Sequence, residues 1–151
     1  KEVIMRRGIP TIITPELLKI LDEMGHGDSL VLGDINFPAA SMAEANNHYA
    51  VRCDGPRSTE LLDAILDLMP LDDFIDKPVT LMRPVEKDKD MLCPIWDEFR
   101  EIISRHDSRG GEGIEFVERF DFYEKAKNAY AVVSTTENAF YGCIIITKGC
   151  F

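Results

Sequence analysis

The segment Gly25-His26-Gly27-Asp28 contains a residue that could transfer protons. An imidazole titrates near neutral pH, so it can both donate and accept a proton under physiological conditions. The flanking glycines permit a sharp turn and leave the ring without bulky neighbours. His26 is therefore a candidate general acid–base, although an isolated histidine is more often a surface or core residue. Asp28 is expected to brace this loop locally.

Three more polar side chains lie where predicted strands begin or end. Asp34 follows the apolar run 29–33, and it could accept hydrogen bonds from hydroxyl groups or cap the turn that follows it. Arg119 could donate several hydrogen bonds to hydroxyl groups, or pair with one of the many acidic residues. Tyr141 offers a hydroxyl and an apolar ring, or is an ordinary core aromatic. Each position keeps both interpretations.

The elements that must position these residues alternate along the chain. Helices are predicted over 15–24, 59–69, 94–103 and 122–130, with a flexible turn at 110–113. Strands are predicted over 29–33, 49–53, 78–83, 114–117, 131–135 and 143–147. Thr14 and Ser58 are expected to cap the first two helices, and Gly25 to end the first in a left-handed conformation. Pro70 must stop the second helix.

This alternation indicates an α/β fold, a single three-layer α/β/α domain over residues 1–151 with a mostly parallel or mixed central sheet. A short loop joins the last two strands, which favours a mixed sheet. In such folds ligands gather near strand ends, where loops converge.

The composition argues against several classes of partner. Of the 151 residues, 45% are hydrophobic and 29% are charged, the balance of a soluble globular protein. The net charge of −10 argues against nucleic acid, which needs basic clusters. No stretch approaches the roughly 20 apolar residues of a membrane helix, and the start lacks the core of a signal peptide. No membrane partner and a cytoplasmic location are expected.

The cysteines and histidines do not suggest a metal centre. The four cysteines are scattered, without a Cys-x-x-Cys pair, so reduced and partly buried thiols are expected. No cluster of candidate ligands has the short spacing typical of structural zinc. Neither a metal nor a cofactor is predicted.

Four sets of segments together resemble the fucose mutarotase/ribose pyranase family over nearly the whole chain. They are Pro15-Glu16-Leu17-Leu18 with Glu23-Met24-Gly25-His26-Gly27-Asp28, Gly33-Asp34 with Asn36-Phe37-Pro38-Ala39, Arg119-Phe120-Asp121-Phe122-Tyr123-Glu124, and Tyr141-Gly142-Cys143-Ile144-Ile145 with Lys148-Gly149. Each set alone is weak, and their order and spacing make the match specific. The Gly-His-Gly-Asp, Asn-Phe-Pro and Arg-Phe-x-Phe-Tyr forms are similar to the fucose branch.

The resemblance implies a cofactor-independent isomerase that interconverts the α and β anomers of a free monosaccharide, with L-fucose as the expected sugar. It implies that His26 is the catalytic, proton-transferring residue. The sugar-binding residues that it implies are Asp34, Arg119, Tyr141, Gly142 and Cys143. It also implies a ring-like homo-oligomer, commonly a decamer, in which a neighbouring subunit completes each pocket.

One departure concerns the choice of sugar. The fucose branch usually has asparagine where this chain has Cys143, and a thiol cannot reproduce the paired donor and acceptor of an amide. Three alternatives stay open: a D-ribose pyranase that exchanges pyranose and furanose forms, a sugar-binding module without turnover, and a metal-dependent isomerase.

Overall fold

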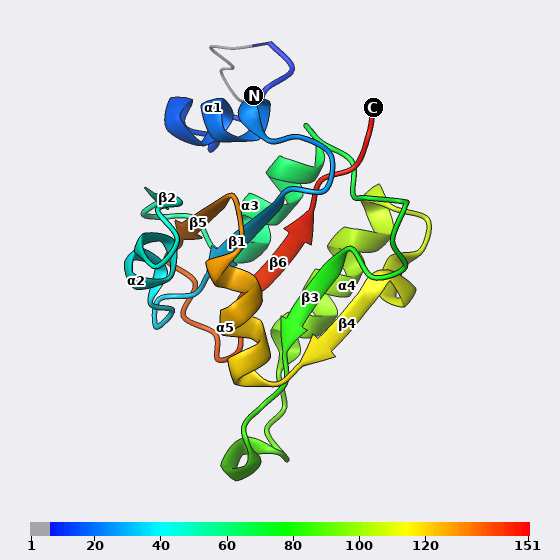
Figure 1. Cartoon of the computed structure of the whole chain (residues 1–151). Helices are drawn as coiled ribbons and strands as arrows, with labels where there is room; N and C mark the ends of the chain where they lie inside the picture. Colours follow the sequence, from blue (N-terminus) through cyan, green and yellow to red (C-terminus); the bar gives the residue numbers. More distant parts are fainter. Residues whose placement is uncertain (1–6) are drawn as a thin grey trace.

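The computed structural model describes residues 7–151 and contains a six-stranded sheet in the order β2-β5-β1-β6-β3-β4 (Figure 1). The strands are β1 (Ser29–Gly33), β2 (Tyr49–Arg52), β3 (Val79–Met82), β4 (Ile114–Val117), β5 (Ala131–Ser134) and β6 (Ile144–Thr147). The pairs β1–β5, β2–β5 and β3–β4 are parallel, and β6 runs antiparallel to both β1 and β3. The predicted mixed sheet is confirmed.

A short segment joins the last two strands, as expected, but they do not form a hairpin. β5 and β6 do not pair, because β1 lies between them. The connecting segment 135–143 instead passes the carboxyl end of β1. There the Ile35 amide donates to the Glu137 carbonyl at 2.7 Å, and the Thr135 amide donates to the Gly33 carbonyl at 3.2 Å. These bonds continue the parallel contact between β1 and β5 beyond the last paired residues, Gly33 and Ser134.

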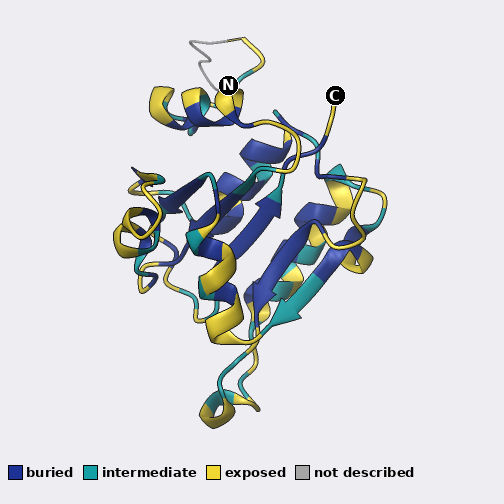
Figure 2. Cartoon of the chain, viewed as in Figure 1, coloured by how far each residue is buried: buried dark blue, intermediate teal, exposed yellow. Residues whose placement is uncertain are grey.

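Helices cover both faces of the sheet. α1 (Pro15–Glu23), α3 (Ser58–Leu66) and α4 (Pro94–His106) pack on one face, and α2 (Ala39–Glu44) and α5 (Arg119–Lys127) on the other. Successive residues of β1 point to opposite faces, so Leu30 and Leu32 join the first core while Val31 joins the second. Figure 2 shows that the central strands β1, β5, β6 and β3 are the buried ones, whereas the edge strand β4 is largely intermediate. The three-layer α/β/α prediction is confirmed.

Several predicted helix ends need correction. The predicted Thr14 cap is confirmed, since its Oγ1 accepts from the Leu17 amide at 3.1 Å. Ser58 does not cap α3, because Arg57 occupies the N-cap position and its amide donates to Glu60 at 2.9 Å. α1 ends at Glu23, and the left-handed residue of the next loop is Gly27 (φ 88°) rather than Gly25.

The last helix begins earlier than predicted. α5 starts at Arg119 and ends at Lys127, because the Glu118 side chain caps it by accepting from the Asp121 amide at 2.7 Å. Three short helices were not predicted: α2, the 3-10 helix η1 (Glu86–Asp88), and the 3-10 helix η2 (Gly110–Gly113), which replaces the expected flexible turn.

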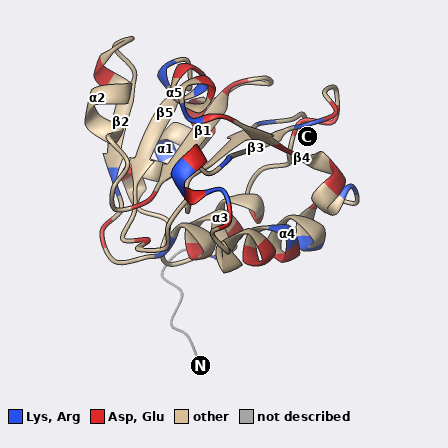
Figure 3. Ribbon diagram, turned by 90° about the horizontal axis from the view of Figure 1, so that it is seen from below, with Lys and Arg blue, Asp and Glu red and all other residues tan. Residues whose placement is uncertain are grey.

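Charged residues of both signs are interspersed along the exposed face of α4 (Figure 3). Arg100 pairs with Asp97 at 2.9 Å, and Arg105 with Glu101 at 3.6 Å. Within residues 7–151, no helix combines the length and the apolarity needed to cross a bilayer.

Candidate active site

Four segments that are distant in sequence meet at one edge of the sheet. β1, β3 and β4 end there, and the antiparallel β6 begins there. They enclose a hollow of about 240 Å³, here called the edge pocket. Four of the predicted site residues line it, namely Asp34, Arg119, Tyr141 and Cys143, together with Asp88 and Tyr123 among others. The sheet topology thus brings most of the predicted site together.

A larger hollow of about 760 Å³ lies beside the edge pocket, between α2 and the ends of β2 and β5. Asp34 borders both. The other charged residues of the larger hollow, Arg52 and Asp54, are exposed and pair with each other at 3.1 Å. We place the candidate site in the smaller hollow, because four of the predicted site residues line it, whereas only Asp34 lines the larger one.

Asp34 fills the turn-capping role considered for it and also lines the edge pocket. Its Oδ1 accepts from the Asn36 amide at 3.0 Å, which caps the turn after β1. A carboxylate can accept about four hydrogen bonds, so it retains capacity for ligand hydroxyls. Its backbone amide lies 3.5 Å from the Cys143 Sγ. The carboxylate is therefore held in place while it lines the pocket.

Tyr141 adopts a left-handed backbone conformation with φ 57°. This conformation costs a non-glycine residue roughly 1–2 kcal/mol, so neighbouring groups must hold it. Its hydroxyl donates to Asp88 Oδ2 at 2.7 Å and accepts from the Val85 amide at 3.2 Å. Burial and the adjacent Asp88 charge raise the pKa of Tyr141, which keeps the phenol neutral. Tyr141 thereby joins the segment after β3 to the pocket.

Arg119 is the first residue of α5 and is paired with an aromatic neighbour. Its Nε donates to the Tyr123 hydroxyl at 3.0 Å, and its guanidinium lies 5.2 Å from the centre of the Tyr123 ring. This hydrogen bond raises the pKa of Arg119. No carboxylate of residues 7–151 lies within ion-pair distance, so the alternative acid partner is not observed. The two terminal nitrogens remain available to a ligand.

Cys143 and Gly142 occupy different surroundings. Burial, with the nearby Asp34 charge, raises the pKa of the Cys143 thiol well above its usual range, so it stays a protonated thiol. Gly142 does not line the edge pocket; its carbonyl accepts from the Ser58 hydroxyl at 3.0 Å. A Cβ at Gly142 would lie 2.9 Å from Glu137 Cγ. The turn needs a glycine at this position for close packing.

His26 lies at the opposite edge of the sheet from the other predicted residues. It precedes β1, whereas Asp34 follows it, and the five residues of β1 span about 16 Å. The expected brace is confirmed, since Asp28 Oδ2 accepts from the Gly25 amide at 2.8 Å. The Gly27 amide donates to the Lys148 carbonyl at 2.9 Å, which fixes the loop to the end of β6. Within one chain, His26 does not reach the edge pocket.

Asp72 is a partner of His26 that the sequence did not single out. Its Oδ1 lies 2.9 Å from His26 Nε2, and its side chain is only 5% exposed. Burial alone would raise the pKa of Asp72, yet the Phe74 amide and His26 hold it below its ordinary value. An ionised carboxylate only accepts, so His26 Nε2 is the donor in this hydrogen bond and Nδ1 is not used by it. The Phe74 ring lies 4.6 Å from the imidazole.

Within the described part of the chain, no group of three or more His, Cys, Asp or Glu residues is placed to hold a metal ion. All four cysteines are free, two of them buried.

Comparisons with known proteins agree with this architecture. The model of the RbsD / FucU transport protein family matches residues 7–151. A fucose mutarotase of Danio rerio is 47% identical, and the alignment covers 97% of this chain and 95% of that protein. The structure of FucU from Bifidobacterium longum superposes with a TM-score of 0.92 at 51% identity, covering 96% of this chain and 99% of that one.

A third relative was solved with a sugar. The fucose mutarotase of Streptococcus pneumoniae in complex with L-fucose has a TM-score of 0.89 and 44% identity, covering 97% of this chain and 99% of that one. The resemblance stated from the sequence motifs is therefore confirmed. The family model matches all described residues, and the alignments with these relatives cover nearly the full length of both chains. The chain therefore belongs to the RbsD / FucU transport protein family.

Proposed function

We propose that this chain is an L-fucose mutarotase, an isomerase that interconverts the α and β anomers of the free sugar. The observation that carries the proposal is the edge pocket, where Asp34, Arg119 and Tyr141 converge from three separate elements. Relatives named fucose mutarotase that align over nearly the full length support the choice of sugar.

The reaction requires only proton transfer. A pyranose opens when a proton reaches the ring oxygen and another leaves the anomeric hydroxyl; closing on the other face gives the second anomer. No electrons are transferred and no group leaves, so the chemistry can proceed without a cofactor. We assign the proton transfer to Nδ1 of His26, whose orientation Asp72 fixes. Such general acid–base assistance typically contributes about 10²–10⁴-fold.

The edge pocket supplies complementary contacts for a neutral polyol. The Asp34 carboxylate accepts hydrogen bonds from sugar hydroxyls, and the free nitrogens of Arg119 donate to them. The Tyr141 hydroxyl is engaged by Asp88 and Val85, so its ring is the part that lies against the sugar. Cys143 contributes only a weak donor.

The position of His26 leads us to propose that neighbouring copies share each active site. A general acid–base must come within hydrogen-bond reach of its proton, about 3 Å, and β1 separates His26 from the pocket of its own chain. We therefore place His26 of one copy in the edge pocket of another. A contact between two different surfaces closes into a ring when its rotation permits, and we propose a ring-like homo-oligomer, a decamer.

Exposed apolar side chains support this association. Near the edge pocket, Ile35, Phe120 and Phe140 are 59%, 67% and 66% exposed. Beside His26, Phe74 is 74% exposed. Burying apolar surface of this kind stabilises an interface, and such groups are typical of protein contacts.

The first experiment measures exchange between the α and β anomeric proton signals of L-fucose by NMR. We expect the native protein to accelerate exchange and His26→Ala to abolish the acceleration. The control is His106→Gln, which alters a histidine on α4 that pairs with Asp63 at 2.7 Å. Saturable sugar binding without acceleration would identify a non-catalytic module, and faster exchange only with D-ribose would identify a ribose pyranase.

A mixing experiment tests whether copies share the site. His26→Ala and Arg119→Ala are unfolded together, refolded as a 1:1 mixture, and sized by light scattering. If one copy supplies His26 and another Arg119, random assembly leaves about a quarter of the pockets intact, since each contribution is intact in half of the copies. Activity near one quarter of the native value supports a shared site. Mixed oligomers as inactive as the separate variants would contradict it.

A further inference from the structure

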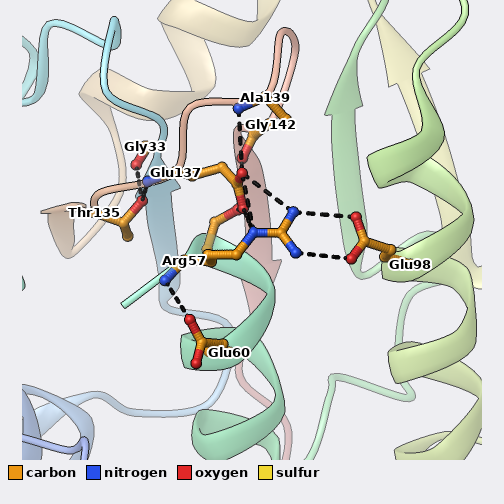
Figure 4. Close-up of polar contacts among 9 residues, drawn as sticks. Gly33, Arg57, Glu60, Glu98, Thr135, Glu137, Ala139 and Gly142 are labelled. Carbon is orange, nitrogen blue, oxygen red and sulfur yellow. Dashed lines mark hydrogen bonds and ion pairs between the residues drawn. The ribbon is translucent and has the colours of Figure 1, made fainter. Parts of the chain in front are cut away.

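Glu137 is a fully buried carboxylate (0% exposed) on the segment 135–143, outside the edge pocket. Every hydrogen-bond partner of its carboxylate oxygens is a donor (Figure 4). Arg57 Nε lies 3.1 Å from Oε1, the Ser58 hydroxyl lies 3.2 Å from Oε1, and the Ala139 amide lies 3.2 Å from Oε2. Because an ionised carboxylate only accepts hydrogen bonds, this surrounding is built for the charged form.

Glu137 also connects the two turns that form the edge pocket. Its backbone carbonyl accepts from the Ile35 amide at 2.7 Å, which ties it to the turn that holds Asp34. The single Ser58 hydroxyl proton lies between two acceptors, Glu137 Oε1 at 3.2 Å and the Gly142 carbonyl at 3.0 Å, and Gly142 belongs to the turn that holds Tyr141. Glu137 thus bonds directly to the turn that holds Asp34 and is linked through Ser58 to the turn that holds Tyr141.

The turn at Tyr141 needs such support. Tyr141 has a strained positive φ of 57°, and conformations of this kind persist only where the surroundings enforce them. The Trp96 indole holds the Tyr141 carbonyl at 3.3 Å. On the next residue, the Ser58 hydroxyl donates to the Gly142 carbonyl, and Glu137 Cγ would lie 2.9 Å from a Cβ placed on Gly142.

We propose that Glu137 is a positioning residue of the sugar site, which holds the Tyr141–Cys143 turn against the Asp34 turn from behind the pocket. The inference rests on the proposed function, because it assigns Glu137 to the same reaction. Glu137 would act on sugar affinity through the residues that it supports, without touching the sugar.

The test is Glu137→Gln, which keeps the shape of the side chain. The substitution replaces one carboxylate oxygen, an acceptor, with an NH₂ group, a donor, among the donor groups of Arg57, Ser58 and Ala139. We expect KM for L-fucose to rise about tenfold and kcat to fall less than about threefold, because the displaced contacts bind ground state and transition state alike. A role in fold stability alone would reduce the folded fraction, which lowers the apparent kcat and leaves KM unchanged.

Two further variants sharpen the comparison. Glu98→Gln is the matched control: Glu98 accepts from the same Arg57 guanidinium at 2.9 and 3.1 Å but does not contact the segment 135–143. Its KM should stay within about twofold of the native value. Ser58→Ala removes the hydroxyl between Glu137 and Gly142, and we expect a KM increase of about fivefold. If Glu137→Gln does not fold, Ser58→Ala decides the question.

Hydrogen exchange gives a readout that does not depend on turnover. The Ala139 amide donates to Glu137 Oε2, so Glu137→Gln should accelerate its exchange, whereas Glu98→Gln should not. A native protein that fails to accelerate anomer exchange would refute the proposed function. The support of the turn by Glu137 could then still be measured by the exchange rate of the Ala139 amide. A native protein that is active, with unchanged KM and unchanged Ala139 exchange in Glu137→Gln, would overturn the inference alone.

Discussion

Gly142→Ala should destabilise the protein, although alanine usually stabilises a chain that can accept it. A Cβ at this position would lie 2.9 Å from Glu137 Cγ, 3.0 Å from the Ala139 carbonyl oxygen and 3.1 Å from Ile95 Cδ1. All three are tighter than ordinary van der Waals contacts, and one of them is backbone. Relief requires a shift of the segment 135–143 or of α4, which together hold the Tyr141 turn.

The magnitude follows from two opposing effects. Overpacking a tight site typically costs 1–3 kcal/mol, and we take about 2 kcal/mol for three contacts. The reduced entropy of the unfolded chain returns about 0.5 kcal/mol. The net loss of about 1.5 kcal/mol corresponds to a decrease in Tm of about 3–6 °C for a protein of this size. Because the turn carries residues that we propose to bind the sugar, KM for L-fucose should rise as well.

The assay is thermal unfolding followed by circular dichroism, with all variants at equal protein concentration, because the proposed association would make Tm concentration-dependent. Gly111→Ala is the matched control: the nearest atom to its Cβ would be Arg100 Cδ at 3.7 Å, an ordinary contact. Its Tm should stay within about 1–2 °C of the native value. A Gly142→Ala protein that melts at or above the native Tm would refute the packing argument.

Two predictions concern stability elsewhere. Phe122 is fully buried between α5 and the sheet, so Phe122→Ala should lose about 3–5 kcal/mol in urea unfolding, whereas Leu92→Ala, at an 88% exposed position, should lose less than about 0.5 kcal/mol. The Arg109 guanidinium lowers the pKa of Asp107 below its unfolded value, so the stability it contributes is present above about pH 4 and is lost as pH falls through the folded pKa. Asp107→Asn should be less stable at pH 7 and show a shallower loss below pH 4; parallel urea curves for both proteins would contradict this.

The local sequence determined most of the elements. Apolar runs such as 29–33 and 143–147 predicted buried strands, and Thr14 marked the start of α1. These signals are local, because burial pattern and capping involve residues a few positions apart. The wrong predictions also have local causes. The helix α2 was missed because six residues are too few to show a helical period. The start of α5 was predicted too late because the Glu118 side chain caps the helix at Arg119, before its first buried residue, Phe122.

The sequence also singled out candidate side chains for the proposed chemistry. Asp34, Arg119, Tyr141 and His26 were singled out by residue type, by position beside predicted strands, and by the resemblance of their segments to one family. Sequence position cannot show which of them meet, because that depends on the order and direction of strands in the sheet. Parallel β1, β3 and β4 with antiparallel β6 gather the first three at one edge.

Only the tertiary structure placed His26 at the opposite edge of the sheet. It also revealed Asp72 as the partner of His26 and Glu137 as the support behind the edge pocket. Asp72 is 46 residues from His26, and Glu137 is 79 residues from Ser58. No periodicity or motif links residues so far apart, since their contact arises from packed elements rather than from the local chain. The chain therefore encodes its reactive groups locally, while folding decides which of them share a site and which hold the others in place.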